Sequence, residues 1–344
     1  MNPSAMLRRG IGVALLGAVA CEAPAPSSLA PTAPTAAKAV ATSQFADDSV
    51  EVSPLLQQVN AALLASGARF QIEKAELLYD NKTWDGQSAT VILANDRSRG
   101  TGSEWVKGDP RRDGRLGVTY AFGSNTAIAP YTIDGTGAQV PTSAAQQLAK
   151  VRQAVAGWRN LSCSSKPIDE VPVPPGTDPD YLDQYFTGNP AGSPNYSQPA
   201  DIVESGWQPG SFFRTIGGGT AGNSILGATF TFIFIDADGN PTDIDRNGKT
   251  DKALAEIYYN ARYLWADNTP GVVDFYSVMG HETGHALGLG HFGKLFVTKK
   301  DAADGLSAAD VKFAPLALMN AGYVIPNQIQ GTDNSQFCQI WSSR

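Results

Sequence analysis

All three histidines of the 344-residue chain lie in one stretch, which reads His281-Glu282-Thr283-Gly284-His285-Ala286-Leu287-Gly288-Leu289-Gly290-His291. If this stretch begins as a helix, His281 and His285 project from one face about one turn apart. Two imidazoles at this spacing can hold one zinc ion, and Glu282 can reach the metal's water without being a ligand. Gly288 lets the chain leave the helix in a conformation that other residues resist, and His291 returns as a third ligand. Three protein ligands leave one zinc position open, which is typical of a catalytic site.

The composition is that of a soluble globular protein, with 42% hydrophobic and 17% charged residues. Glycine (35 residues) and proline (22 residues) are frequent, which predicts many turns and long loops. The length allows one large domain or two smaller ones. A formal net charge of −7 does not favour a nucleic-acid partner.

The N-terminus has the pattern of a targeting segment. Arg8 and Arg9 precede an apolar run at 11–20 that is too short to span a bilayer. The run ends in the small residues Ala18-Val19-Ala20, which resemble a cleavage site. We therefore predict that residues 1–20 are a signal peptide and that the mature protein is exported.

Cysteine usage fits an exported protein. Cys21 directly follows the predicted cleavage site, as in a bacterial lipobox, although Ala18 stands where leucine is usual. Two locations stay open: a lipoprotein of the outer membrane or cell surface, anchored at Cys21, or a freely secreted protein. With Cys21 set aside, Cys163 and Cys338 either form a disulfide or remain separate thiols.

The rest of the chain divides by composition. Residues 21–52 are rich in Ala, Pro, Ser and Thr and are predicted to be a flexible tether. Residues 53–106 are either an N-terminal subdomain or a pro-region. Residues 107–344 form the main domain, with no internal repeat.

Local patterns predict the main elements. The predicted helices are 53–64, 143–161 and a motif helix that begins near Asp274, followed by a turn and a closing helix. The predicted strands are 89–93, 116–122, 200–203 and 228–235. A long loop is predicted at about 166–198.

An acidic stretch at 236–251 precedes the motif helix. Asp243, Asp245, Asn247 and Asp251 match ligand positions of a calcium loop. Leu254 stands where a bidentate glutamate is expected, so the stretch is not a standard EF-hand. Two interpretations stay open: a structural calcium site or a solvated acidic turn.

The motif together with a following methionine resembles the metzincin zinc endopeptidases. The segment Ala317-Leu318-Met319-Asn320-Ala321-Gly322-Tyr323 is similar to the methionine turn of the matrixin branch, in which a tyrosine follows the methionine by four residues. This resemblance covers about residues 107–344. It departs from the matrixin pattern at Ala321, where proline is usual, and at Phe292, where serine is common.

The resemblance implies an α+β fold. Its parts would be a twisted mixed β-sheet, a long first helix, an active-site zinc helix, a Met-turn and a C-terminal helix. The unusually long stretch between His291 and Met319 implies an inserted loop near the cleft. No cysteine-switch motif is visible, so latency by that route is not expected.

The resemblance also implies an exported zinc endopeptidase that acts on proteins or peptides. Zinc would activate a water molecule, and Glu282 would be the general base. Met319 would pack as an apolar floor below the histidines, and Tyr323 would line the pocket for the side chain after the scissile bond. The alternative is a non-catalytic zinc-binding or protein-binding module on the same scaffold. Oligomeric state does not follow from the sequence.

Overall fold

The computed structural model describes most of the chain after residue 49. The described residues are 50–83, 88–95, 102–123, 128–175, 177, 179–187, 198–297, 311–323 and 328–342. The predicted signal peptide, most of the predicted tether and Cys21 lie outside them. Within these ranges no helix is both long enough and apolar enough to cross a membrane.

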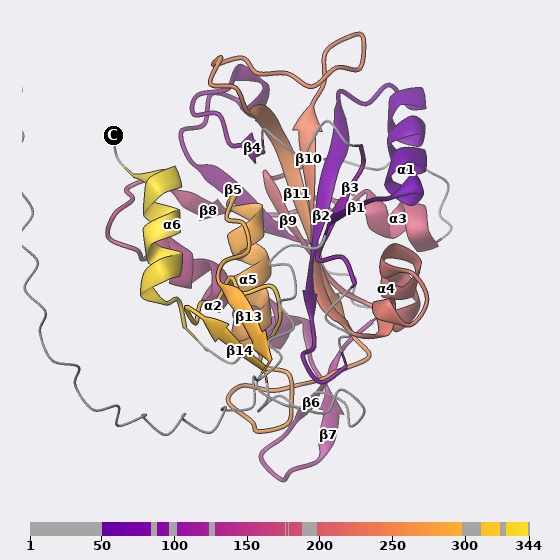
Figure 1. Ribbon diagram of the computed structural model, residues 1–344, viewed down its shortest axis with the longest axis vertical. Helices are drawn as coiled ribbons and strands as arrows, with labels where there is room; N and C mark the ends of the chain where they lie inside the picture. Colours follow the sequence, from indigo (N-terminus) through magenta and orange to yellow (C-terminus); the bar gives the residue numbers. More distant parts are fainter. Residues whose placement is uncertain are drawn as a thin grey trace, which may run out of the picture. The chain divides into compact units, whose positions relative to one another are not determined.

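A mixed β-sheet lies at the centre of the described chain (Figure 1). Its strands follow the order β1 (Val50–Val52), β3 (Val91–Leu93), β2 (Phe70–Tyr79), β10 (Ile225–Phe234), β11 (Thr250–Asn260), β9 (Ile202–Gln208), β5 (Val118–Phe122) and β8 (Ile168–Glu170). The short β4 (Ser103–Glu104) also pairs with β11. Neighbouring strands run antiparallel from β3 to β11 and parallel from β11 to β8.

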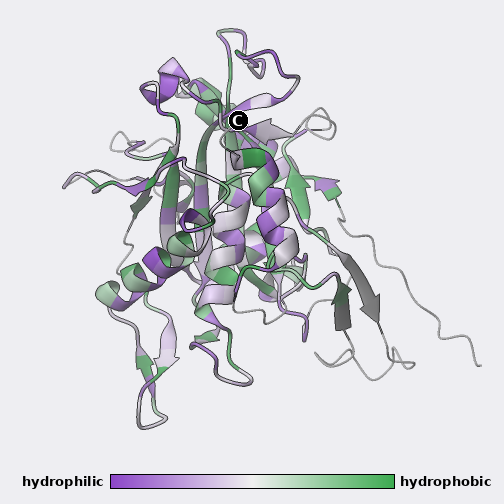
Figure 2. Ribbon diagram, turned by 90° about the vertical axis from the view of Figure 1, so that its left-hand side faces the viewer, coloured by the Kyte–Doolittle hydropathy of each residue, from purple (hydrophilic) through white to green (hydrophobic). Residues whose placement is uncertain are grey.

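Helices cover both faces of this sheet (Figure 1). One face carries α1 (Pro54–Ala65), α3 (Leu182–Thr187) and α4 (Gly210–Gly217). The other face carries α2 (Ala144–Arg159), α5 (Phe275–Ala286) and α6 (Gly331–Trp341). Each face has its own buried hydrophobic cluster, and the strands of the sheet are largely hydrophobic in Figure 2. Burial on both faces explains why β10 is a nearly continuous apolar run.

Side-chain caps fix where three of the helices begin. Ser53 accepts a hydrogen bond from the Leu56 amide before α1, and Ser143 forms a capping box with Gln146 before α2. Asp274 caps α5 by accepting from the Ser277 amide at 2.8 Å. These helices begin where the sequence predicts them.

Smaller elements surround the large sheet. The strands β12 (Leu264–Trp265), β6 (Tyr131–Ile133) and β7 (Gln139–Pro141) form a second sheet. The insertion between His291 and Met319 contains the antiparallel pair β13 (Lys294–Val297) and β14 (Val311–Ala314). The described residues also contain the 3-10 helices η2 (Pro110–Arg112) and η3 (Ala221–Asn223).

The structure differs from the predicted elements in several places. The predicted loop at 166–198 contains β8 and α3. Residues 50–52, which were assigned to the tether, form β1 because their backbone pairs with β3. Residues 70–79 and 250–260 form the long strands β2 and β11, which the sequence patterns did not predict. Through β1, β2 and β3 the described part of residues 50–95 belongs to the same sheet as the strands that follow.

Candidate active site

The motif stretch forms α5 and the turn that follows it. His281 and His285 lie one turn apart on α5 and are fully buried. The helix ends at Ala286, and Gly288 has a φ of +101°, in the left-handed region that favours glycine. This turn brings His291 back toward the two helical histidines.

The three histidines converge through their Nε2 atoms. His285 Nε2 lies 2.9 Å from His281 Nε2 and 3.1 Å from His291 Nε2. Nitrogens bound to one tetrahedral zinc at about 2.0–2.1 Å are separated by roughly 3.3 Å. The separation in the structure is therefore close to that of a zinc site.

Hydrogen bonds to the backbone set the tautomer of both helical histidines. His281 Nδ1 lies 2.7 Å from the Leu318 carbonyl oxygen, and His285 Nδ1 lies 2.9 Å from that of Leu289. A carbonyl only accepts, so each Nδ1 carries the proton and each Nε2 presents a lone pair. Burial lowers the pKa of both rings, which keeps them neutral. Lone pairs that face each other need a cation between them, and the donor set fits zinc.

Glu282 lies on α5 between the two helical histidines in sequence and is fully buried. Its Oε2 accepts a hydrogen bond of 2.6 Å from Thr229 Oγ1 on β10, and its Oε1 has no partner among the described residues. Burial raises the pKa of Glu282 well above its usual range, and the charges of Glu76 and Glu204 add to this. A cation beside the carboxyl group would lower this pKa.

Two glycines make room for this site. A Cβ at Gly227 on β10 would lie 2.6 Å from Glu282 Oε1. A Cβ at Gly284 would lie 2.4 Å from Met319 Sδ. Any larger residue at these positions would displace the carboxyl group or the methionine.

The predicted Met-turn packs against α5, and α6 holds it in place. Met319 is fully buried next to Gly284. Asp333 on α6 accepts hydrogen bonds from the amides of Leu318 (2.8 Å) and Met319 (3.0 Å). Because Leu318 also binds His281, α6 helps to position a metal ligand.

Tyr323 ties the Met-turn segment to two other elements. Its hydroxyl accepts from the Asp274 amide at 2.7 Å, at the start of α5. Its own amide donates to the Tyr79 carbonyl on β2 at 2.8 Å. The structure thus places Tyr323 beside β2 as well as beside the zinc helix.

The last turn of α5 is held by buried donors that the sequence patterns did not single out. The indole of Trp158 donates to the Gly280 carbonyl in the middle of α5. At the end of the helix, the indoles of Trp105 and Trp341 donate to the carbonyls of Ala286 and Leu287. Lys252 on β11 directs its ammonium group at the carbonyls of His285 and Ala286, at 3.2 and 3.4 Å. These donors satisfy carbonyls that a helix C-terminus leaves free.

Two buried glutamates near α5 were also missed. Glu76 on β2 places Oε1 3.3 Å from His285 Nδ1. Glu204 on β9 accepts from Tyr259 and Thr283, and burial raises its pKa to about 7. No local pattern marks either residue, since each reaches the site only through the order of strands in the sheet.

The acidic stretch before α5 separates into several parts. The carboxyl groups of Asp243, Asp245 and Asp251 converge. Asp251 also accepts from Arg111 at 2.7 Å. Glu256 lies apart from this group, because it is buried on β11 and accepts from the amides of residues 181 and 182.

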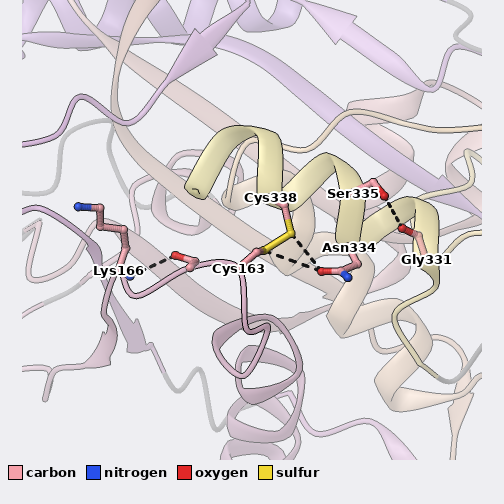
Figure 3. The surroundings of a disulfide bond; sticks show 7 residues. Cys163, Lys166, Gly331, Asn334, Ser335 and Cys338 are labelled. Carbon is pink, nitrogen blue, oxygen red and sulfur yellow. Dashed lines mark hydrogen bonds between the residues drawn. A yellow bond between two sulfur atoms is a disulfide. The ribbon is translucent and has the colours of Figure 1, made fainter. Parts of the chain in front are cut away.

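Cys163 and Cys338 form a disulfide bond (Figure 3). Cys163 follows the end of α2, and Cys338 lies on α6. Asn334, one turn earlier on α6, lies beside the bond (Figure 3). The bond therefore links the helix that packs on α5 to the helix that holds the Met-turn.

Comparison with known families agrees with this site. Residues 237–324 match the model of the M43 peptidase family, described as pregnancy-associated plasma protein-A, which is a metzincin-type metallopeptidase family. The matched residues include α5, the three histidines and Met319. Fold, site and match support a metzincin-like zinc metallopeptidase that acts on proteins or peptides, without favouring the matrixin branch. No curated protein matches the chain.

Proposed function

We propose that the protein is an exported zinc-dependent endopeptidase in which Glu282 is the general base. The observation that carries this proposal is the convergence of three histidine Nε2 atoms next to a buried carboxyl group with one free oxygen. Zinc, when bound, supplies a Lewis acid that polarises a peptide carbonyl and makes a nearby water more acidic.

The residues around the metal site support the remaining steps. Thr229 fixes Glu282 through Oε2, so that Oε1 is the atom available to take a proton from water. The same atom can later return that proton to the leaving amine. Met319 and Asp333 keep the histidines in place, and burial excludes competing water.

Two finer parts of the proposal have separate support. Export is supported by the Cys163–Cys338 bond, because disulfides persist in oxidising compartments. Whether the exported chain is anchored at Cys21 or released concerns residues outside the described ones. A matrixin-like turn is supported by the spacing of Met319 and Tyr323 and by the contact of Tyr323 with the start of α5.

Hydrolysis of casein by the zinc-loaded protein tests this function. We expect cleavage that a zinc chelator abolishes and that added zinc restores, with one zinc ion bound per chain. The assay is run on two forms of the protein. One is the intact chain, and the other is cut between residues 95 and 102, which separates β1, β2 and β3 from the later sequence. Zinc binding without cleavage in both forms would favour the non-catalytic module.

We also predict that calcium stabilises the fold through Asp243, Asp245 and Asp251. Burial and the charge of Glu104 raise the pKa of Asp245, and a bound cation would oppose this rise. Calcium that binds only the folded state adds about 2.7 kcal/mol at a hundredfold excess over its dissociation constant.

The measurement is the melting temperature with and without calcium, at constant zinc and ionic strength. Asp243→Ala should remove the calcium-dependent rise. Asp236→Ala is the matched control, because Asp236 carries the same charge but caps a separate turn through the amides of Asp238 and Asn240. If calcium does not change the melting temperature of the wild type, the acidic stretch is a solvated turn and not a calcium site.

A further inference from the structure

The geometry points to a latent active site: β2 lies where an extended peptide substrate would bind, and residues 50–95 keep the site covered. This inference rests on the proposed endopeptidase function and concerns its regulation. It follows from three observations: β2 pairs with β10, β2 directs side chains toward the α5 face, and Glu76 on β2 contacts His285.

The strand next to the catalytic carboxyl group is β10. Its residues Gly227 and Thr229 contact Glu282 directly. One edge of β10 pairs with β11. The other edge is the one that an extended peptide could join by adding a strand, which is a common mode of peptide recognition.

β2 takes this second edge along the whole of β10. The pairing is antiparallel and runs from Tyr79 opposite Ile225 to Phe70 opposite Phe234. Glu76 stands opposite Thr229, which itself bonds Glu282. The backbone groups that would hold a substrate next to the general base are therefore already engaged.

The other edge of β2 is held as well. Up to Leu77 it pairs with residues 90–93. At Tyr79 it forms a parallel bridge with Gly322, and the Tyr323 amide donates to the Tyr79 carbonyl. The side chain of Asn81 then donates to the Tyr323 carbonyl. The strand thus passes between β10 and the segment that follows the Met-turn.

Alternate residues of β2 face opposite sides of the sheet. Ala75, Leu77 and Tyr79 belong to the buried cluster on the α1 face. Leu78 belongs to the cluster on the α5 face, which also contains Met319. Glu76, on the same side as Leu78, lies 3.3 Å from His285 Nδ1. β2 therefore directs Glu76 at His285 and Leu78 into the hydrophobic cluster on the α5 face.

The covering segment works without a thiol. The cysteines of the chain are at positions 21, 163 and 338, so residues 50–95 contain none. The acidic side chain that they place beside the histidines is Glu76. Latency here would come from strand pairing and burial of Leu78, and not from a sulfur ligand to the metal.

A cut in the full-length chain tests this inference. Residues 96–101 are replaced by the recognition sequence of a specific protease, and the zinc-loaded protein is compared before and after the cut. Two readouts are used: hydrolysis of a fluorogenic peptide and binding of a peptidyl hydroxamate, which needs an accessible metal. A site open in 1% of molecules binds ligands about 100-fold more weakly than an open one. We expect at least a 10-fold gain in both readouts after the cut.

The control carries the same recognition sequence in the exposed turn at 135–137, between β6 and β7. Cutting there should change neither readout. A second arm leaves the chain intact and compares Leu78→Ala with Leu77→Ala. Both side chains are fully buried, but only Leu78 lies on the α5 face. Leu78→Ala should raise hydroxamate affinity several-fold more than Leu77→Ala.

The outcomes separate latency from catalysis. Latency would be overturned if hydroxamate affinity and hydrolysis were equal before and after the cut and Leu78→Ala gave no gain. The proposed protease function would be unaffected by this result. A gain in hydroxamate affinity without hydrolysis would support latency and count against catalysis. A gain in both supports both. Zinc content and melting temperature are recorded for every form, so loss of fold is recognised directly.

Discussion

Glu282→Gln is expected to lower kcat for peptide cleavage by about 10²–10⁴-fold, the usual contribution of a positioned general base. The substitution keeps the size of the side chain and leaves an oxygen that can accept from Thr229. It removes the group that takes a proton from water. Zinc content should not change, because the three histidines form the metal-binding cluster without Glu282.

Glu204→Gln is the matched control for this experiment. Glu204 is as buried as Glu282 and also contacts α5, but through Thr283 on the side of Tyr259. Its substitution should alter stability more than kcat. The measurement is kcat in the most active form of the chain, with zinc quantified in the same samples. Near wild-type turnover by Glu282→Gln would rule out its role as the base.

Loss of the Cys163–Cys338 bond is expected to cost about 2–5 kcal/mol of unfolding free energy. The bond closes a loop with a sequence separation of 175 residues, and long loops gain most from closure in the chain-entropy model. It also fixes α6, whose Asp333 holds the Met-turn. The double variant Cys163→Ser/Cys338→Ser should therefore bind zinc more weakly as well.

Urea unfolding of the zinc-loaded variant and of the wild type measures this cost. Cys21→Ser, which removes a thiol outside the pair, serves as the control. Reductant should destabilise the wild type and leave the double variant unchanged. Equal midpoints for the two proteins under oxidising conditions would contradict the prediction.

Local chemistry explains which parts of the molecule could be predicted from sequence. Ser53, Ser143 and Asp274 cap helices at the predicted positions, because capping depends on residues within one turn. The convergence of the histidines follows from helical spacing and from one glycine turn. The histidine cluster could be predicted from sequence because its three members lie within eleven residues.

The strands β2 and β11 could not be predicted in the same way. Their sequences, FQIEKAELLY and TDKALAEIYYN, are rich in Glu, Lys, Ala and Leu, which favour helices. They are strands because each is buried between two neighbours, and strand propensity depends on such context. The position of Glu76 beside His285 depends on this sheet order and was invisible for the same reason.

The acidic stretch illustrates the limit of motif matching. Asp251 fits a ligand position by number, but its carboxylate also binds Arg111, Thr242 and the Ile244 amide. Arg111 is 140 residues away in sequence. Spacing within a loop cannot reveal a partner at that distance.

The pairing of β2 with β10 also has a consequence for the order of folding. β2 and β3 are close in sequence and can form a hairpin early, and β10 and β11 can do the same. The paired residues of β2 and β10, however, are 146 to 164 positions apart. An edge of β2 therefore stays unpaired until the chain through Phe234 has emerged, which makes docking of the two hairpins the slow, aggregation-prone event. The same docking step joins β2 to β10 and, under the latency proposed above, closes the histidine site. The site would therefore be closed as soon as this part of the sheet forms.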